Sequence, residues 1–250
     1  MDTTQKFTER AVDYVKGRPV YAERFLQSLT ENYGVGFGMT AADVGCGTGK
    51  FSGQLLKTGC RVYGVEPNDD MRRQAEKLLG AQPGFHVVKG TASDTTLGDH
   101  SVDLVTCAQA FHWFDPEIFS AECRRILRPK GMVFLIWNLR REEAEINREM
   151  YRLYTSFCPD FKGFAGGIHK DDDRIRRFFS RGYQYEEYDN PLFYTMETFV
   201  SRSLSGSYSL KEGDPGYQTF LRDIRAVFRK YERDGKVKMP NKTVVYFGRV

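Results

Sequence analysis

The chain turns from strand to helix in the stretch Met39-Thr40-Ala41-Ala42-Asp43-Val44, which runs directly into Gly45-Cys46-Gly47-Thr48-Gly49-Lys50. The first half is short and mostly apolar, which is typical of a buried strand. The second half is rich in glycine, which adopts backbone angles closed to other residues and lets a ligand approach the main chain. Apolar residues then resume a helical period with Phe51, Leu55 and Leu56. The stretch therefore predicts a strand, a tight turn and a helix.

The same unit repeats along the next ninety residues. Apolar runs at 60–65, 85–88, 102–107 and 132–137 predict four further strands, with helices predicted between them. Strands that alternate with helices form a parallel sheet, because parallel neighbours need crossover connections and the crossovers cover both faces. The pattern predicts a doubly wound, Rossmann-like α/β fold whose ligand binds at the carboxyl ends of the strands.

The two ends of the chain differ from this core. The first forty residues predict two helices broken at Gly17-Arg18-Pro19. Beyond Asn138, the sequence predicts a charged helix over 140–157, an extended strand over 183–195 and helices over 196–204 and 217–233. A closing strand over 242–248 is expected to pair with 183–195, antiparallel to the rest of the sheet.

Composition limits the class of protein. The chain has 250 residues, 40% of them hydrophobic, and its 37 basic and 33 acidic residues give a net charge of +4, which is far from the basic stripe of a dedicated nucleic-acid binder. No apolar run is long enough for a membrane span and no secretion segment opens the chain, so a cytoplasmic protein without a membrane partner is expected. Five cysteines without a CxxC pair and four scattered histidines argue against a disulfide framework and a metal site.

The residues around the glycine turn indicate which nucleoside ligand it holds. Glu66 follows the next strand, about 20 residues on, where a carboxylate accepts hydrogen bonds from both ribose hydroxyls. Lys50 stands where a dinucleotide fingerprint has its third glycine, and Asp43 would repel a pyrophosphate but could help to hold an ammonium group. S-adenosylmethionine carries an ammonium and no phosphate, so the sequence favours it over NAD.

An ordered series of motifs resembles the class I S-adenosylmethionine-dependent methyltransferases, in the small-molecule branch called methyltransferase type 11. The series comprises Asp43 to Gly49, Gly64-Val65-Glu66-Pro67, Asp103-Leu104-Val105 and Leu127 to Met132. The resemblance implies a helical lid over 1–38, an S-adenosylmethionine-binding core over 39–138, and remaining strands with helical substrate-cap insertions over 139–250. Its product would be S-adenosylhomocysteine.

The resemblance also implies a set of cofactor-binding residues. The glycine turn would approach the methionine portion, Pro67 and Met71 would lie along the adenine, and the stretch from Cys107 to Gln109 would line the sulfonium. Relatives carry an acidic residue where this chain has Ser93, so either Ser93 or Asp94 would meet the adenine amine. The full set is Asp43, Gly45, Cys46, Gly47, Thr48, Gly49, Glu66, Pro67, Met71, Ala92, Ser93, Cys107, Ala108 and Gln109.

Three residues are candidates for catalysis. His112 follows the fourth strand and would serve as a general base, orient the substrate, or simply close over the cofactor. Tyr14 and Arg18 come from the lid, where the guanidinium could grip a carboxylate of the cofactor or the substrate. Trp113 and Phe114 would either line the ligand pocket or pack beside it without contacting a ligand.

Charge near the expected cap gives a weaker indication. Arg140, Arg141, His169 and Lys170 would make its entrance basic and suit an acidic substrate, although the run from Arg140 to Glu143 is more typical of a solvated face.

These observations predict methyl transfer to a small molecule, with a carboxylate as one acceptor class. Nucleic-acid methylation is disfavoured, because Ala108-Gln109-Ala110-Phe111-His112 lacks the Asn- or Asp-Pro-Pro-aromatic stretch of adenine methyltransferases. A protein substrate and a noncatalytic cofactor-binding module stay open as alternatives, since a fold does not guarantee chemistry. An NAD-dependent oxidoreductase is disfavoured by Lys50 and Asp43.

Overall fold

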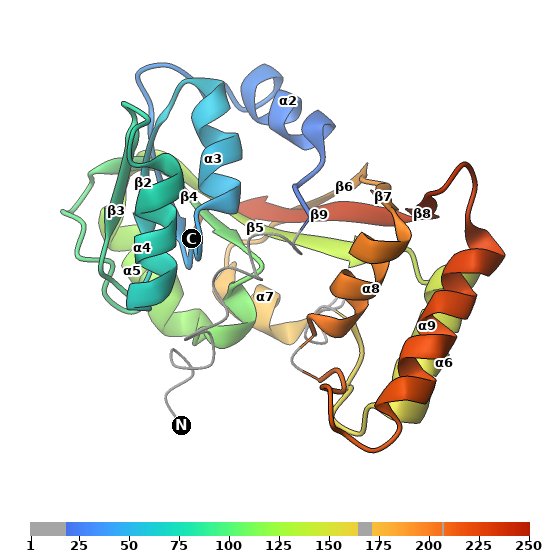
Figure 1. Cartoon of the computed structure of the whole chain (residues 1–250). Coiled ribbons are helices and arrows are strands. Elements are labelled where there is room, and N and C mark those ends of the chain that lie inside the picture. Colours follow the sequence, from blue (N-terminus) through green and yellow to red (C-terminus); the bar gives the residue numbers. More distant parts are fainter. Residues whose placement is uncertain (1–18, 165–171, 207) are drawn as a thin grey trace.

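The computed structural model describes residues 19–164, 172–206 and 208–250. Strands and helices alternate through the first half of the chain, and more helices follow in the second half (Figure 1). The strands are β1 (Thr40–Val44), β2 (Arg61–Val65), β3 (Phe85–Val88), β4 (Val102–Ala108), β5 (Leu127–Arg140), β6 (Gln184–Asp189), β7 (Leu192–Tyr194), β8 (Val237–Met239) and β9 (Asn241–Gly248). The helices are α2 (Glu23–Glu31), α3 (Lys50–Leu55), α4 (Asp69–Leu79), α5 (Pro116–Ile126), α6 (Glu145–Phe157), α7 (Asp173–Phe178), α8 (Met196–Leu204) and α9 (Tyr217–Tyr231).

Seven strands form one sheet in the order β3-β2-β1-β4-β5-β9-β6. The pairs among β1 to β5 are parallel, and β9 lies antiparallel between β5 and β6. The order runs outward from β1 in both directions, so the carboxyl ends of β1 and β4 are adjacent where the winding reverses. The doubly wound sheet with an antiparallel last strand is confirmed, and the glycine turn lies at its switch point.

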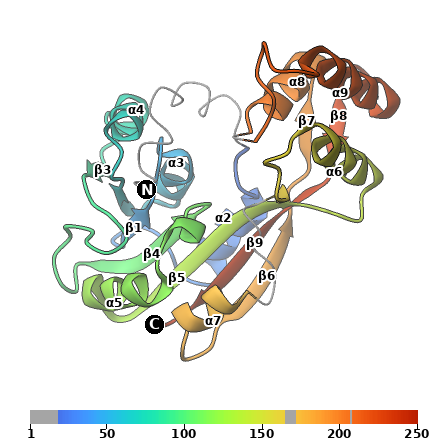
Figure 2. The same cartoon turned by 90° about the horizontal axis from the view of Figure 1, so that it is seen from below.

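Helices cover both faces of the sheet, as Figure 2 shows from below. Alternate residues of β5 explain how one strand serves two cores: Val133, Leu135 and Trp137 pack with α5 and α7, whereas Phe134 and Ile136 pack with α2, α3 and α4. All these side chains are buried. The long apolar run therefore reflects a strand covered on both faces.

Local caps fix the two helices that begin beside the expected site. The Asn68 side chain accepts a hydrogen bond from the Met71 amide (3.0 Å) at the start of α4. Asp115 does the same for the first turn of α5, where Pro116 occupies a position that needs no amide donor. These caps fix the residues at which α4 and α5 begin, and so fix where the loops after β2 and β4 end.

The second half departs from the sequence predictions in two places. The strand predicted over 183–195 is two strands, because Pro191 has no amide to continue the ladder and the chain leaves the sheet there. Only β6 pairs with β9, while β7 pairs with β8 in a separate two-stranded sheet. The helix predicted from residue 140 begins at Glu145, since β5 extends to Arg140 along eight paired positions of β9. The short helix α7 was not predicted.

A third core holds the C-terminal elements together. Helices α6, α8 and α9 and the β7–β8 pair bury aromatic and aliphatic side chains such as Tyr154, Phe199 and Phe220. Figures 1 and 2 place these helices together beyond the ends of β5 and β9, away from α3 and α4. We call α6, α8, α9 and β7–β8 the C-terminal group.

Two further predictions bear on the described residues. All five cysteines are free and buried, as expected. The second predicted N-terminal helix is α2, while the first lies outside the described residues. No helix in the described parts of the chain is long and apolar enough to cross a membrane.

Candidate functional site

The glycine turn has a backbone that only glycine adopts without strain. Gly45, Gly47 and Gly49 all have positive φ angles, of +74°, +57° and +80°. The amides of Gly45 and Cys46 donate to the carbonyl of Val65, at 2.8 and 3.2 Å, which holds the turn against the end of β2. The turn therefore brings the ends of β1 and β2 together.

Space around these glycines differs from one to the next. A Cβ on Gly45 would lie 2.6 Å from the Cβ of Ala110, and one on Gly49 would lie 2.7 Å from Leu79. A Cβ on Gly47 would meet nothing within 4 Å. Packing against Ala110 thus demands glycine at the first position, the tip of Leu79 crowds the third, and the second faces open space that a ligand could fill.

Glu66 lies directly beside this open space. Its carboxylate accepts a hydrogen bond from the Gly47 amide at Oε2 (3.0 Å) and another from the Asn68 amide at Oε1 (2.9 Å). Burial raises the pKa of Glu66, although the two amide donors and Arg72 act in the opposite direction. Each oxygen keeps an acceptor position, so a preoriented carboxylate stands where two adjacent hydroxyls could donate to it.

Asp43 lies beneath the turn. The side chain is fully buried, and its oxygens accept hydrogen bonds from the hydroxyls of Ser52 (2.6 Å) and Thr106 (2.9 Å). Burial raises its pKa to about 6, against the effect of those hydroxyls. Asp43 links β1 to α3 and β4 through these hydrogen bonds. Because its side chain is buried, it could interact with a ligand ammonium only through a bound water or through the backbone of the turn.

The loop after β4 forms the facing wall. Gln109 has a positive φ of 59°, its amide donates to the Ile136 carbonyl (2.8 Å), and its side chain donates to the Asn138 carbonyl (3.1 Å). The side chain of Cys107 is buried in the core, so Ala108 and Gln109 are the members of that stretch that remain partly accessible. The short 3₁₀ helix Phe111–Trp113 then carries the half-buried His112 beside Trp113, which is 43% exposed.

The residues expected around adenine lie on two neighbouring loops. Pro67 is partly exposed and Met71 is buried at the start of α4. Ala92 is partly buried and Ser93 is exposed, with its hydroxyl 2.9 Å from that of Thr91. The carboxylate of Asp94 accepts from the Thr96 amide (3.0 Å) and is exposed as well.

Some expected residues lie elsewhere. Cys46 and Thr48 are buried within the turn, and burial raises the pKa of the Cys46 thiol well above its ordinary value. Tyr14, Arg18, His169 and Lys170 lie outside the described residues. The residues expected to bind the cofactor thus lie at or after the carboxyl ends of β1, β2, β3 and β4, with Asp43 and Cys107 buried beneath the others.

The sequence analysis missed one residue that organises this region. The Asn138 side chain accepts from Thr243 (2.6 Å) and from the Asn190 side chain (3.0 Å), and it donates to the Val20 carbonyl (3.1 Å). It therefore joins β5, β9 and the segment before α2 at the point where Gln109 docks. A polar residue directly after a continuous apolar run was the signal that could have found it.

Arg140 contradicts the prediction of a solvated charged run. Its guanidinium lies over the ring of Phe164, 4.1 Å from the centroid, and its Nη1 atom is buried. The neighbouring Arg141 points the other way and forms ion pairs with Asp189 and Glu143. The reason is the extension of β5: because successive side chains on a strand alternate, one arginine faces inward.

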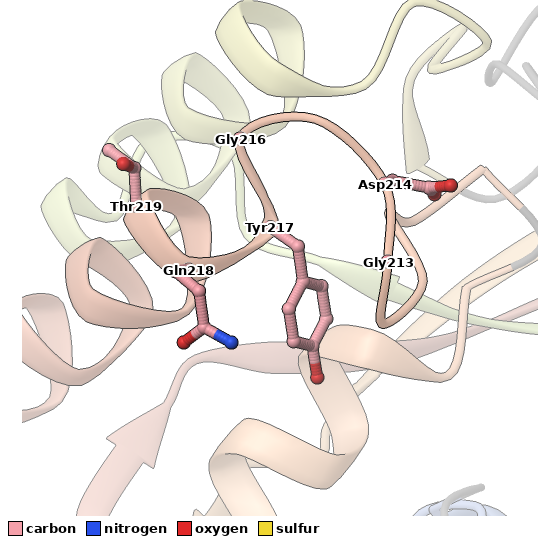
Figure 3. Close-up of a pocket in the computed structure, with 6 residues that line it drawn as sticks. All are labelled: Gly213, Asp214, Gly216, Tyr217, Gln218 and Thr219. Atoms are coloured by element: carbon pink, nitrogen blue, oxygen red, sulfur yellow. The ribbon is translucent and has the colours of Figure 1, made fainter.

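A surface hollow at the start of α9 is separate from this site. Figure 3 shows Gly213, Asp214, Gly216, Tyr217, Gln218 and Thr219 around it. Its one charged side chain, that of Asp214, accepts a hydrogen bond from the Lys211 amide (2.7 Å). None of the residues expected to bind a cofactor lines it.

Comparisons with known proteins find a similarity that includes the glycine turn and its neighbours. Residues 42–135 match the family described as "Methyltransferase domain". An uncharacterized methyltransferase of Mycobacterium tuberculosis is 35% identical over 149 residues, which is 60% of this chain and 58% of that protein. The chain thus matches less than two thirds of the length of this relative.

Solved structures share the fold over most of the chain. A candidate type II methyltransferase from Anaeromyxobacter dehalogenans is 23% identical, with a TM-score of 0.64 and coverage of 92% of this chain and 95% of that one. A SAM-dependent methyltransferase from Aquifex aeolicus is 19% identical, with a TM-score of 0.50 and coverage of 70% and 89%. At these identities the likeness establishes the Rossmann-like fold.

Proposed function

We propose that the chain, whose residues 42–135 match the methyltransferase domain family, is a class I S-adenosylmethionine-dependent methyltransferase that acts on a small molecule. The observation that carries the proposal is the Glu66 carboxylate, held by two backbone amides beside the open side of Gly47. The relative from Aquifex aeolicus is named for dependence on the same cofactor.

The residues present fit S-adenosylmethionine. Glu66 offers acceptors to the ribose hydroxyls, and the absence of any atom near a Gly47 Cβ leaves room for the ligand against the main chain. Pro67 and the Ala92-Ser93 loop flank the side on which adenine would lie, and Ala108 with Gln109 flank the opposite side. The cofactor supplies a methyl group on a positively charged sulfur, and transfer to a nucleophile leaves S-adenosylhomocysteine.

The protein's own contribution is to bind, align and exclude water. Gln109 is held by its two hydrogen bonds to β5, which fixes the wall beside the reacting end of the site. His112 lies one short turn further along and would orient the acceptor or take its proton. A carboxylate acceptor is ionised at neutral pH and needs no base, whereas a phenol or an amine gains from one.

We further propose that the N-terminal segment and the C-terminal group close the acceptor side as lid and cap. Support for this comes from Asn138, which binds the Val20 carbonyl and lies on the strand that leads into the C-terminal group. Tyr14 and Arg18 belong to the proposed lid, where Arg18 would contact a carboxylate.

The test is methyl transfer with labelled S-adenosylmethionine and a panel of carboxylic acids, phenols and amines. We expect label in at least one acceptor class, with formation of S-adenosylhomocysteine. Glu66→Gln should lower this turnover at least tenfold when S-adenosylmethionine is limiting, and Glu31→Gln, a change of the same kind on the exposed face of α2, should not. No turnover with any acceptor, while the cofactor binds, would favour the noncatalytic module.

A further inference from the structure

Arg140 is a half-buried cation that lacks a counter-charge in the part of the chain that the structure describes. Its Nη1 atom is buried and forms no hydrogen bond there. Burial lowers the pKa of the guanidinium, and the groups that act on it are Tyr154, Tyr194, Tyr208 and another cation, Arg202. No carboxylate is among these groups.

Such an arrangement is unfavourable unless something completes it. An arginine is charged at every physiological pH, and partial removal of an uncompensated charge from water is unfavourable. The ring of Phe164 at 4.1 Å offsets part of that cost through a cation–π contact, but it leaves the in-plane donors unused. The neighbouring Arg141 forms ion pairs with two carboxylates, whereas Arg140 forms none with the described residues.

The position of Arg140 relates it to the proposed acceptor side. It lies two residues beyond Asn138 on β5, on the same face of the strand, and the Asn138 carbonyl is bonded to Gln109. Two residues of strand span about 7 Å. A guanidinium that points from there into the C-terminal group lies within the reach of a small molecule whose other end is beside Gln109.

The surroundings of Arg140 describe what would bind. The partly exposed rings of Phe161, Phe164 and Tyr208 form an aromatic wall beside the guanidinium, backed by the buried ring of Tyr154, with the ring centroids of these residues 4.8 to 5.7 Å apart. Aromatic walls suit an apolar body, and the planar fork of arginine suits a carboxylate.

We propose that Arg140 binds the carboxylate of the methyl acceptor, and that this aromatic wall holds the acceptor's apolar part. The proposal rests on the proposed methyltransferase function and specifies its substrate class: a small organic acid with an apolar body. The acid would enter with its charge against the guanidinium and its nucleophile toward Gln109.

Direct binding tests this without knowledge of the true acceptor. Phenylacetate, hexanoate and succinate, each beside its uncharged amide, are titrated into the protein alone and into protein saturated with S-adenosylhomocysteine. We expect phenylacetate or hexanoate to bind at least tenfold more tightly than its amide. Arg140→Gln should remove this preference, Arg140→Lys should keep part of it, and Arg141→Gln should leave it intact.

Two controls separate the possible failures. Arg140→Gln should bind S-adenosylhomocysteine within twofold of the wild type, which shows that the cofactor site is intact in the variant. If the wild type itself does not bind S-adenosylhomocysteine, the proposed function is wrong, and the carboxylate titrations still test the anion site separately. Arg140→Met should melt no lower than the wild type, because it removes an uncompensated charge. The proposal is overturned if no carboxylate binds the wild type, if Arg140→Gln binds them equally well, or if Arg140→Met unfolds at a clearly lower temperature.

Discussion

Gly47→Ala tests whether glycine is required at this position for its backbone conformation or for the space that it leaves to a ligand. Gly47 has a φ of +57°, and a Cβ there would meet no protein atom within 4 Å. The substitution should therefore cost only the left-handed backbone strain, about 1 kcal/mol of unfolding free energy. The new methyl group would, however, enter the space beside Glu66 in which we place the ligand. We expect S-adenosylhomocysteine to bind at least 30-fold more weakly, which corresponds to about 2 kcal/mol.

Gly38→Ala is the matched control. Gly38 has a φ of +86°, a Cβ there would also meet nothing within 4 Å, and it lies in the turn before β1 rather than after it. It should lose a similar amount of stability and keep full affinity. Denaturant unfolding and calorimetric titration on the three proteins give both quantities. If Gly47→Ala binds within twofold of the wild type, the open side of Gly47 is not a ligand site and our placement is wrong.

Other predictions concern residues below the turn. Gly45→Ala combines a positive φ with a Cβ 2.6 Å from that of Ala110, so it should destabilise the fold by about 2–4 kcal/mol in denaturant unfolding, and a loss below 1 kcal/mol would contradict the close packing. Asp43 has a folded pKa of about 6 against an ordinary 3.8, so the folded state holds its proton more tightly. Its contribution to stability is complete below pH 4 and is lost as the pH rises toward 6, by about 3 kcal/mol. Asp43→Asn lacks this loss, so its stability relative to the wild type should rise between pH 4 and 7; a flat difference across that range would refute the buried, shifted carboxyl.

The strands and the turn of the sheet could be predicted from the sequence, because each of these elements is determined by a few residues that are adjacent in the chain. The glycine turn, the apolar runs of β1 to β5 and Glu66 all lie where the spacing put them. The predicted pairing of the closing strand with 183–195 is confirmed for residues 184–189.

Features set by tertiary contacts could not be predicted. The inward side chain of Arg140 depends on how far β9 extends β5, and the apolar run ends before that point. The exact environment of Asp43 depends on Ser52 and Thr106, which come from α3 and β4. The same holds for Asn138, whose partners lie up to 118 residues away in the chain.

The most direct test of the central claim is calorimetric titration of S-adenosylhomocysteine into the wild type and into Glu66→Gln. We expect micromolar binding to the wild type and at least tenfold weaker binding to the variant, about 1.4 kcal/mol. The glutamine keeps one acceptor oxygen for the Gly47 or Asn68 amide, so the turn should persist and the loss should report on the ribose. No binding to the wild type, or equal binding to both proteins, would contradict the account.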